Sequence, residues 1–450
     1  MIAARKSLGP RAASRPAPGR LLSLAVLAAA AALAGCADDE DPRLPGERIA
    51  IRPSVQPGGE VTGETRPIPA AETRADWPQV GGDAGHAGGH PAGPSSPSLA
   101  WRVSAGPGAE DRLTDSGPVI ADGVIFLRDG EAGVRAFDAG SGRRRWDVDL
   151  TPDGESSATG FGGGLAVVGD RLYVTNGFGL VAALNVADGA EIWRHQAQAP
   201  IHSAPVVAGG KVIAVTRANK AVALNAEDGS VAWTKDSGLN RAGNLGGSAP
   251  AATENVVALP YGSGELVLAR TESGATLWSA TLVSPGKVEG MAAFPDVTSA
   301  PALGPGPSVV AANAGGAMAL FDGRNGRRVW QLDFGSMSPV WEVADTLYAV
   351  TSEPSVVRVD IGTGDIMWRA PLETWEDPED REIPIGYGGP VLAGGRVLVT
   401  SSDGRLMAFD PQTGAPGAVI EMPGGSRTGV AAAGGTLYVH TVDGDLLAYR

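Results

Sequence analysis

Short apolar runs, each followed by a polar turn and a second apolar run, alternate along the chain from about residue 99 to its end. Within them an eleven-residue pattern recurs seven times: a small or apolar residue, Asp or Asn at the third position, Gly at the seventh and Trp at the eleventh. The copies are AFDAGSGRRRW (136–146), ALNVADGAEIW (183–193), ALNAEDGSVAW (223–233), LARTESGATLW (268–278), LFDGRNGRRVW (320–330), RVDIGTGDIMW (358–368) and AFDPQTGAPGA (408–418). Such runs separated by Asp or Asn and Gly are typical of β-hairpins. The pattern predicts an all-β chain.

The last positions of successive copies are 38 to 52 residues apart, close to the length of a four-stranded propeller blade. A second pattern, small–Pro–Val–x–x–Gly/Asp followed by an apolar strand, precedes each hairpin and starts near Gly117, Gly164, Ala204, Ala249, Ala300, Ser338, Gly389 and Thr428. The final unit has only three strands, whereas an isolated strand, 99–103, precedes the first one. We therefore expect an eight-bladed β-propeller of four-stranded antiparallel blades, its last blade closed by the N-terminal strand.

The tryptophans of the repeat are expected to pack one blade against the next. They are Trp101, Trp146, Trp193, Trp233, Trp278, Trp330 and Trp368. Two copies depart from the pattern, since Arg270 replaces the Asp or Asn and Ala418 replaces the Trp.

The N-terminal 35 residues have the features of a secretory signal: basic residues, then the apolar run 21–33, which is too short to span a membrane. The run ends in Leu-Ala-Gly-Cys, which resembles a bacterial lipobox with Cys36 as the lipidated first mature residue. Cys36 is also the chain's single cysteine, so a disulfide framework and a thiolate metal site are excluded. We expect a lipid-anchored protein, and Ala37 after the cysteine favours sorting to the outer membrane.

Residues 36–75 are acidic and rich in Pro and Gly, and they predict a flexible tether between the lipid and a propeller of residues 76–450. Removal of the signal takes away five basic residues and changes the formal net charge from −14 to −19. This charge repels nucleic acid and anionic headgroups, so no nucleic-acid partner is expected and attachment to the membrane depends on lipid chains.

Catalytic patterns are absent from the sequence. His86 and His90 lie in a Gly-rich loop rather than on one helix face, and no G-x-S-x-G elbow or phosphate-binding loop with Lys occurs. Most carboxylates belong to the tether or to hairpin turns. We therefore expect no catalytic residues, no metal and no cofactor. Two alternatives remain open: a periplasmic quinoprotein dehydrogenase dependent on pyrroloquinoline quinone, and a lipoprotein sensor that binds a small ligand in the propeller funnel.

Three connections between an outer strand and the next inner strand are long, and this position places all three at one mouth of the ring. They are 235–247, 284–299 and 373–388. The first two combine apolar and charged residues, as protein-binding rims do.

The combination of lipobox, the segment Pro-Gly-Glu-Arg (45–48), Trp-Pro-Gln-Val-Gly-Gly (77–82) and the seven repeats resembles the BamB family of propeller lipoproteins, over the whole chain. The resemblance implies a non-catalytic scaffold of the outer-membrane β-barrel assembly (Bam) complex. It implies binding to POTRA domains of BamA and to other Bam subunits, with unfolded outer-membrane proteins as further partners, at the periplasmic face of the outer membrane.

The resemblance also implies where BamA binds. The family's acidic segment D-V-x-T/S-x-P matches Asp296 to Pro301, with Thr298 in the position of a second acid, and the family's Leu–Arg–Gly run corresponds to Asn244-Leu245-Gly246. Arg241 is the candidate substitute for the missing Arg, and Met291 and Phe294 are candidate apolar contacts. We expect Asp296 to be exposed on its loop, so that its substitution affects a partner and not the fold.

Overall fold

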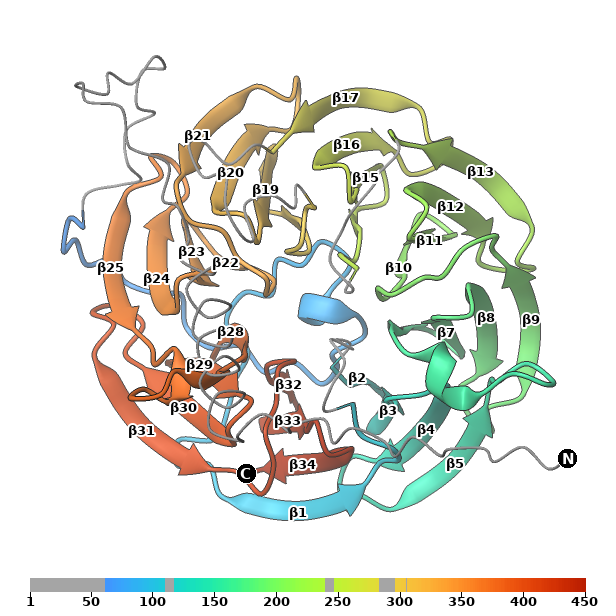
Figure 1. The fold of residues 1–450 in the computed structure, drawn as a ribbon, viewed down its shortest axis with the longest axis horizontal. Coiled ribbons are helices and arrows are strands. Elements are labelled where there is room, and N and C mark those ends of the chain that lie inside the picture. The colour runs from blue at the N-terminus through green and yellow to red at the C-terminus, as the bar shows by residue number, and fades with distance from the viewer. Residues whose placement is uncertain (1–60, 110–116, 239–246, 283–295, 305) are drawn as a thin grey trace, which may run out of the picture. The chain divides into compact units, whose positions relative to one another are not determined.

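The computed structural model describes residues 61–109, 117–238, 247–282, 296–304 and 306–450. In these residues eight four-stranded antiparallel sheets surround a central channel, as Figure 1 shows. The predicted eight-bladed β-propeller is confirmed. Cys36, the signal segment and the tether up to residue 60 lie outside the described residues.

Each blade runs from an inner strand at the channel to an outer strand at the rim (Figure 1). Blades 1 to 4 comprise β2 (Val119–Ala121), β3 (Val124–Arg128), β4 (Gly133–Asp138) and β5 (Arg144–Asp149); β6 (Gly163–Val168), β7 (Arg171–Asn176), β8 (Leu180–Asn185) and β9 (Glu191–Gln196); β10 (Val206–Ala208), β11 (Lys211–Val215), β12 (Lys220–Asn225) and β13 (Val231–Asp236); and β14 (Ala251–Ala252), β15 (Val256–Pro260), β16 (Glu265–Arg270) and β17 (Thr276–Thr281).

Blades 5 to 7 comprise β18 (Ala302–Leu303), β19 (Ser308–Asn313), β20 (Ala317–Asp322) and β21 (Arg328–Leu332); β22 (Trp341–Val343), β23 (Thr346–Val350), β24 (Ser355–Asp360) and β25 (Ile366–Pro371); and β28 (Tyr387–Ala393), β29 (Arg396–Ser401), β30 (Arg405–Phe409) and β31 (Pro416–Glu421). A separate hairpin of β26 (Trp375–Asp377) and β27 (Glu382–Pro384) lies between blades 6 and 7, and two short 3-10 helices are η2 (Val80–Gly82) and η3 (Ser157–Gly160).

Blade 8 closes the ring with strands from both ends of the propeller. It contains β32 (Ala431–Ala433), β33 (Thr436–His440) and β34 (Asp445–Tyr449), with β1 (Leu99–Ser104) as its outer strand. Leu99 pairs with Tyr449 and Ser104 with Asp445. The predicted closure by the N-terminal strand is therefore confirmed, and β1 covers the edge of β34 that would otherwise be open.

The repeated tryptophans lie between neighbouring blades. Six of them donate the indole N–H to a backbone carbonyl in the next blade's hairpin turn, always the carbonyl one residue after the Asp, Asn or Arg of the pattern. The pairs are Trp146–Val186, Trp193–Ala226, Trp233–Thr271, Trp278–Gly323, Trp330–Ile361 and Trp368–Pro411, at 2.7 to 3.1 Å. Each ring also covers the Gly of that turn, so that a β-carbon there would overlap the indole. The pattern's Gly and Trp thus belong to one contact, made across the blade boundary.

Ala418 stands in place of the Trp in the one copy whose next blade offers no hairpin turn for an indole to contact. A Trp on β31 would face blade 8, whose outer hairpin turn does not exist because β34 and β1 come from opposite ends of the propeller. The corresponding contact on the other side of the closure is present, since Trp101 covers Gly142 of blade 1. Arg270 keeps the backbone bonds of its turn, with Gly274 donating to the Arg270 carbonyl at 2.9 Å.

The contact between Gly and Trp gives a stability prediction. Gly229 and Gly169 both have positive φ (72° and 60°), but a β-carbon at Gly229 would overlap the Trp193 ring, whereas one at Gly169 has no atom within 4 Å. We expect Gly169→Ala to cost about 1–2 kcal/mol of backbone strain and Gly229→Ala to cost about 1–3 kcal/mol more, because the added methyl group overpacks the boundary. Urea unfolding of both variants measures the difference, and equal losses would show that the ring contact is unimportant.

The N-terminal segment closes one mouth of the channel. Residues 74–91, which we call the plug, cross the centre of the ring in Figure 1 and bond to the inner strand or its turn in all eight blades. The bonds join Trp77 to Ile120 (2.8 Å, in both directions), Pro78 to Val167 (2.9 Å), the Gln79 amide to Val207 (2.9 and 3.0 Å), Ala84 to Ala252 (2.7 Å), Gly85 to Leu303 (2.8 Å), Gly89 to Glu342 (3.3 Å), Pro91 to Gly394 (2.9 Å) and Arg74 to Gly434 (2.7 Å). The plug thus satisfies backbone groups that the inner strands present to the channel.

Aromatic packing fastens the plug to blade 6. Trp77 stacks on Trp341 with ring centroids 5.5 Å apart, and the Trp341 indole donates to the Gly89 carbonyl at 2.8 Å. Both rings are buried. A β-carbon at Gly88 would overlap Trp341, which explains a Gly at this position.

Residues 61–73 differ from the predicted flexible tether. Val61 forms a parallel bridge with Ile366 at the outer edge of blade 6, and Thr62 and Gly63 donate to the carbonyls of Ile366 and Met367. Arg66 pairs with the buried carboxylate of Asp360, further along the same blade. Polar and Gly-rich composition led to the tether prediction, but these contacts use mainly backbone groups, which composition does not reveal. The described part of the propeller unit therefore starts before residue 76.

Candidate partner-binding face

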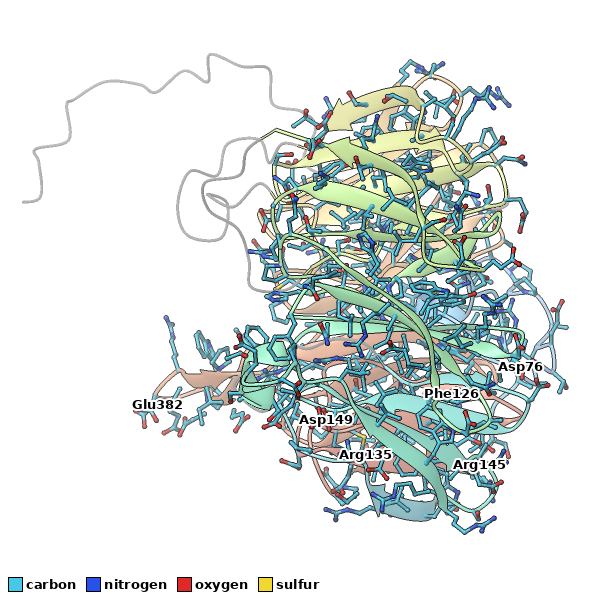
Figure 2. All side chains as sticks on the ribbon, turned by 90° about the vertical axis from the view of Figure 1, so that its right-hand side faces the viewer. Asp76, Phe126, Arg135, Arg145, Asp149 and Glu382 are labelled. Atoms are coloured by element: carbon cyan, nitrogen blue, oxygen red, sulfur yellow. The ribbon has the colours of Figure 1, made fainter. Side chains whose placement is uncertain are left out.

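Two faces of the ring differ in what covers them. The outer strands end, and the next inner strands begin, on one face, which we call the loop face, and the plug lies at the opposite one. Figure 2 shows Glu382, in the β26–β27 hairpin, projecting from one side of the ring and Asp76, in the plug, on the other side. The prediction that the long connections share one mouth follows from this antiparallel topology.

The β26–β27 hairpin projects from the loop face, and side-chain interactions fix its base. At its base the Tyr387 hydroxyl donates to the Glu373 carbonyl at 2.7 Å, and Arg405 pairs with the Glu373 carboxylate at 2.7 Å. Burial raises the pKa of Tyr387 to about 12, so it remains a neutral donor. Ile385 is buried beneath the hairpin. Because an isolated two-stranded hairpin is marginal in water, this base is what orders the projection.

The tip of the hairpin is acidic with one apolar side chain. Its exposed carboxylates are Glu376, Asp377, Glu379, Asp380 and Glu382. Arg381 is the only basic residue of the hairpin (375–384), and Ile383 is 61% exposed. Ile383 also has a positive φ of 55°, unusual for a β-branched residue. Exposed apolar surface beside charge is the composition expected of a contact site for another protein.

Two hollows occupy the channel above the plug. The larger has a volume of about 420 Å³, with Trp77 of the plug in its floor and the base of the hairpin, Ile385, in its wall. The smaller, about 110 Å³, lies between blades 3, 4 and 5. Met337 lines both of them and is 46% exposed, an apolar side chain between the two openings.

Asp296 lies in the smaller hollow, and the expectation that it is exposed is wrong. Its side chain is 4% exposed, and Val297 next to it pairs with Asn313 of blade 5. Thr298 donates from its hydroxyl to the Ser336 carbonyl at 2.9 Å. The segment 296–301 is thus fastened into the inner wall of the ring by backbone pairing, which a Pro-flanked loop sequence does not show. A charge reversal at Asp296 would disturb packing as well as any partner.

The other candidate contacts, Arg241, Asn244, Leu245, Met291 and Phe294, lie outside the described residues. The described neighbours of these segments, such as Ser248, which donates to the Ser299 carbonyl at 2.9 Å, belong to blades 4 and 5 at the loop face. Sequence reasoning missed Met337 and Ile383, because an isolated apolar residue in a loop carries no periodic signal.

Within the described ranges no group of three or more His, Cys, Asp and Glu side chains is placed to hold a metal. The two histidines of the GHAGGH sequence bond to different backbone carbonyls. His86 bonds to Pro301 before blade 5 (2.8 Å), and His90 bonds to Pro69 in the segment 61–73 (2.7 Å). Burial lowers the pKa of His440 to about 4, so it is neutral at physiological pH. No helix among the described residues is long and apolar enough to cross a membrane.

A family model described as outer membrane protein assembly factor BamB matches residues 130–370 and 352–450, most of the ring. The chain belongs to the BamB family. A BamB relative from Yersinia pestis is 25% identical over 70% of this chain and 81% of its own length. One from Burkholderia pseudomallei is 28% identical over 78% and 87%.

Solved structures show how widely the BamB fold is shared. BamB from Moraxella catarrhalis matches with a TM-score of 0.66 and 18% identity, covering 79% of this chain and all of that one. Quinohemoprotein alcohol dehydrogenase from Comamonas testosteroni matches nearly as well, with a TM-score of 0.63 and 17% identity over 84% of this chain and 81% of that one. The ring alone therefore does not separate BamB from the dehydrogenases, and the sequence match to the family does.

Proposed function

We propose that the chain is a non-catalytic scaffold lipoprotein of the Bam complex, which binds BamA and assists the insertion of β-barrel proteins into the outer membrane. The observation that carries the proposal is the BamB family match over the blades. The lipobox ending in Cys36 supports it, because a scaffold at the periplasmic face of the outer membrane needs an anchor when its net charge opposes adsorption.

The loop face is the surface we propose for BamA. It carries the two exposed apolar side chains Met337 and Ile383, acidic residues on a fixed hairpin, and the ends of the connections in which Leu245 and Asp296 lie. The opposite mouth is filled by the plug. Binding energy in protein interfaces concentrates in a few apolar anchors surrounded by polar residues, and Met337 is the described side chain that fits an anchor best. Unfolded outer-membrane proteins are proposed as further, transient ligands of the same face.

Met337→Asp should weaken capture of BamA by at least tenfold, because it places a charge at an apolar anchor without altering a buried side chain. Val329→Asp is the matched control: Val329 is 42% exposed, on the outer strand β21 of the neighbouring blade, and the change is the same in kind. The measurement is co-purification of BamA with the tagged, full-length protein in mild detergent, alongside the thermal unfolding midpoint of each variant.

Three possible results distinguish an error in the proposed binding surface from an error in the proposed function. Loss of BamA with Met337→Asp but not with Val329→Asp supports the loop face. Equal capture by both variants places the contact elsewhere, and Ile383→Asp and Leu245→Ala then test the hairpin and the connection before blade 4. Absence of BamA from the wild-type preparation contradicts the proposed function itself.

A further inference from the structure

A buried carboxylate without a partner lies at the boundary of blades 5 and 6, directly under the plug. Glu342, on the inner strand β22, is 2% exposed, and neither of its carboxylate oxygens has a hydrogen-bond partner. Its side chain lies over Gly304 and near the Ser308 hydroxyl of blade 5, and a β-carbon at Gly304 would overlap Oε2. Its own backbone carbonyl accepts from Gly89 of the plug. Glu342 is therefore in contact with the plug through its backbone and with the blade boundary through its side chain.

A second carboxylate, that of Asp83, belongs to the turn of the plug that bonds to blade 5 beside Gly304. Asp83 is fixed by its own turn, in which one carboxylate oxygen accepts from the backbone N–H of Gly85 (2.9 Å) and of Ala87 (3.2 Å). Gly85 in turn accepts from Leu303 of blade 5. Burial first, and the negative charge of Asp83 second, disfavour ionisation of the Glu342 carboxyl.

Among the described residues no basic side chain bonds to the Glu342 carboxylate. Burial and the Asp83 charge raise the pKa of Glu342 to about 7, with no Lys or Arg acting in the opposite direction. His86 of the plug is titratable, but its Nδ1 is used by the Pro301 carbonyl and burial lowers its pKa, so it is neutral. The guanidinium of Arg74, also in the plug, lies against Gly82 and Gly89 and does not contribute to the pKa shift of Glu342. A buried carboxylate without a hydrogen-bond partner or counter-charge is unfavourable, and a bound cation is a common remedy.

We propose that Asp83 and Glu342 bind a hard divalent cation, Ca²⁺ in particular, that ties the plug to blades 5 and 6. Carboxylate oxygens from both elements, with the Ser308 hydroxyl and neighbouring backbone carbonyls, form an all-oxygen set of the kind that Ca²⁺ prefers. Ca²⁺ tolerates irregular coordination better than Mg²⁺, which demands a near-ideal octahedron. Gly304 leaves the space that the Glu342 carboxylate and the ion require. The site has only two acidic ligands, so its affinity is moderate.

The test uses full-length protein freed of metal with a chelator. Ca²⁺ should raise the thermal unfolding midpoint in a saturable way, and Tb³⁺ should give luminescence sensitised by Trp341 and Trp77, which lie beside the site. Glu342→Gln and Asp83→Asn remove one charge each with little change of shape, and both should abolish the Ca²⁺ shift and the Tb³⁺ signal. Glu376→Gln, on the exposed hairpin, is the matched control and should change neither.

Other outcomes overturn the proposal. A wild-type midpoint that does not respond to Ca²⁺ would do so, as would a Tb³⁺ signal that survives in both variants. If Glu342→Gln instead raises the midpoint equally with and without Ca²⁺, the site holds a proton rather than a metal. If Glu342→Gln fails to fold, Asp83→Asn and metal analysis of the wild-type protein by mass spectrometry give the decision.

Discussion

A chain that begins at Pro97 should fold into a closed ring of much lower stability than one that begins at Val61, because it keeps β1 and loses the plug. Trp77 alone is buried against Trp341, and loss of such a ring costs about 3–5 kcal/mol. The inner strands, or the turns that follow them, also lose partners for their backbone groups in all eight blades. Urea unfolding of the two purified chains measures the difference, and unchanged midpoints would show that the plug is only a passive covering.

A chain that begins at Ser104 provides the comparison. It loses the closing strand as well, so that β34 becomes an open edge and Trp101 no longer covers Gly142. Open edges pair with other chains, and we expect aggregation of this form rather than a second, less stable monomer. Monomeric behaviour in size-exclusion chromatography would contradict the closure.

Replacement of the proposed lipidated residue, Cys36→Ser, should release the protein from the membrane almost completely. The formal charge of −19 expected after removal of the signal opposes adsorption to anionic headgroups, so attachment should depend on the lipid. Fractionation of cells with metabolic labelling by a fatty-acid analogue measures both attachment and acylation.

The neighbouring change Ala37→Ser serves as the control, since it leaves the cysteine in place and should leave the protein attached. Membrane-bound wild-type protein with an unmodified Cys36 would contradict the anchor. If the Cys36→Ser protein is released and keeps its thermal stability, Cys36 is needed for membrane attachment and not for folding.

The blades could be predicted from sequence because their signal is repeated and local. Asp or Asn, Gly and Trp at fixed spacing describe one hairpin, and seven copies leave little freedom in strand number or closure. Even the exception at Ala418 has a physical reason, the missing turn in blade 8. Local chemistry repeated at a regular interval is what single-sequence reasoning reads best.

The plug and the details of the loop face could not be predicted in the same way. Residues 74–91 bond to eight blades that are up to about 360 residues away, mostly through backbone groups that any residue supplies. The burial of Asp296 and of Glu342 depends on how the segments meet in space. The composition of the N-terminal segment correctly showed that it is not part of the repeat. The absence of periodicity does not, however, distinguish a flexible tether from a segment that bonds to the ring along its length.

The plug determines whether another polypeptide could pass through the ring. A ring with an open axis could admit a chain at one side and release it at the other, in the manner of a translocating pore. Here the axis is a dead end: Trp77, Val80 and Gly81 line the larger hollow at the plug. A polypeptide that enters the ring must leave through the mouth by which it came. The protein can therefore hold or orient a chain, but it cannot thread one.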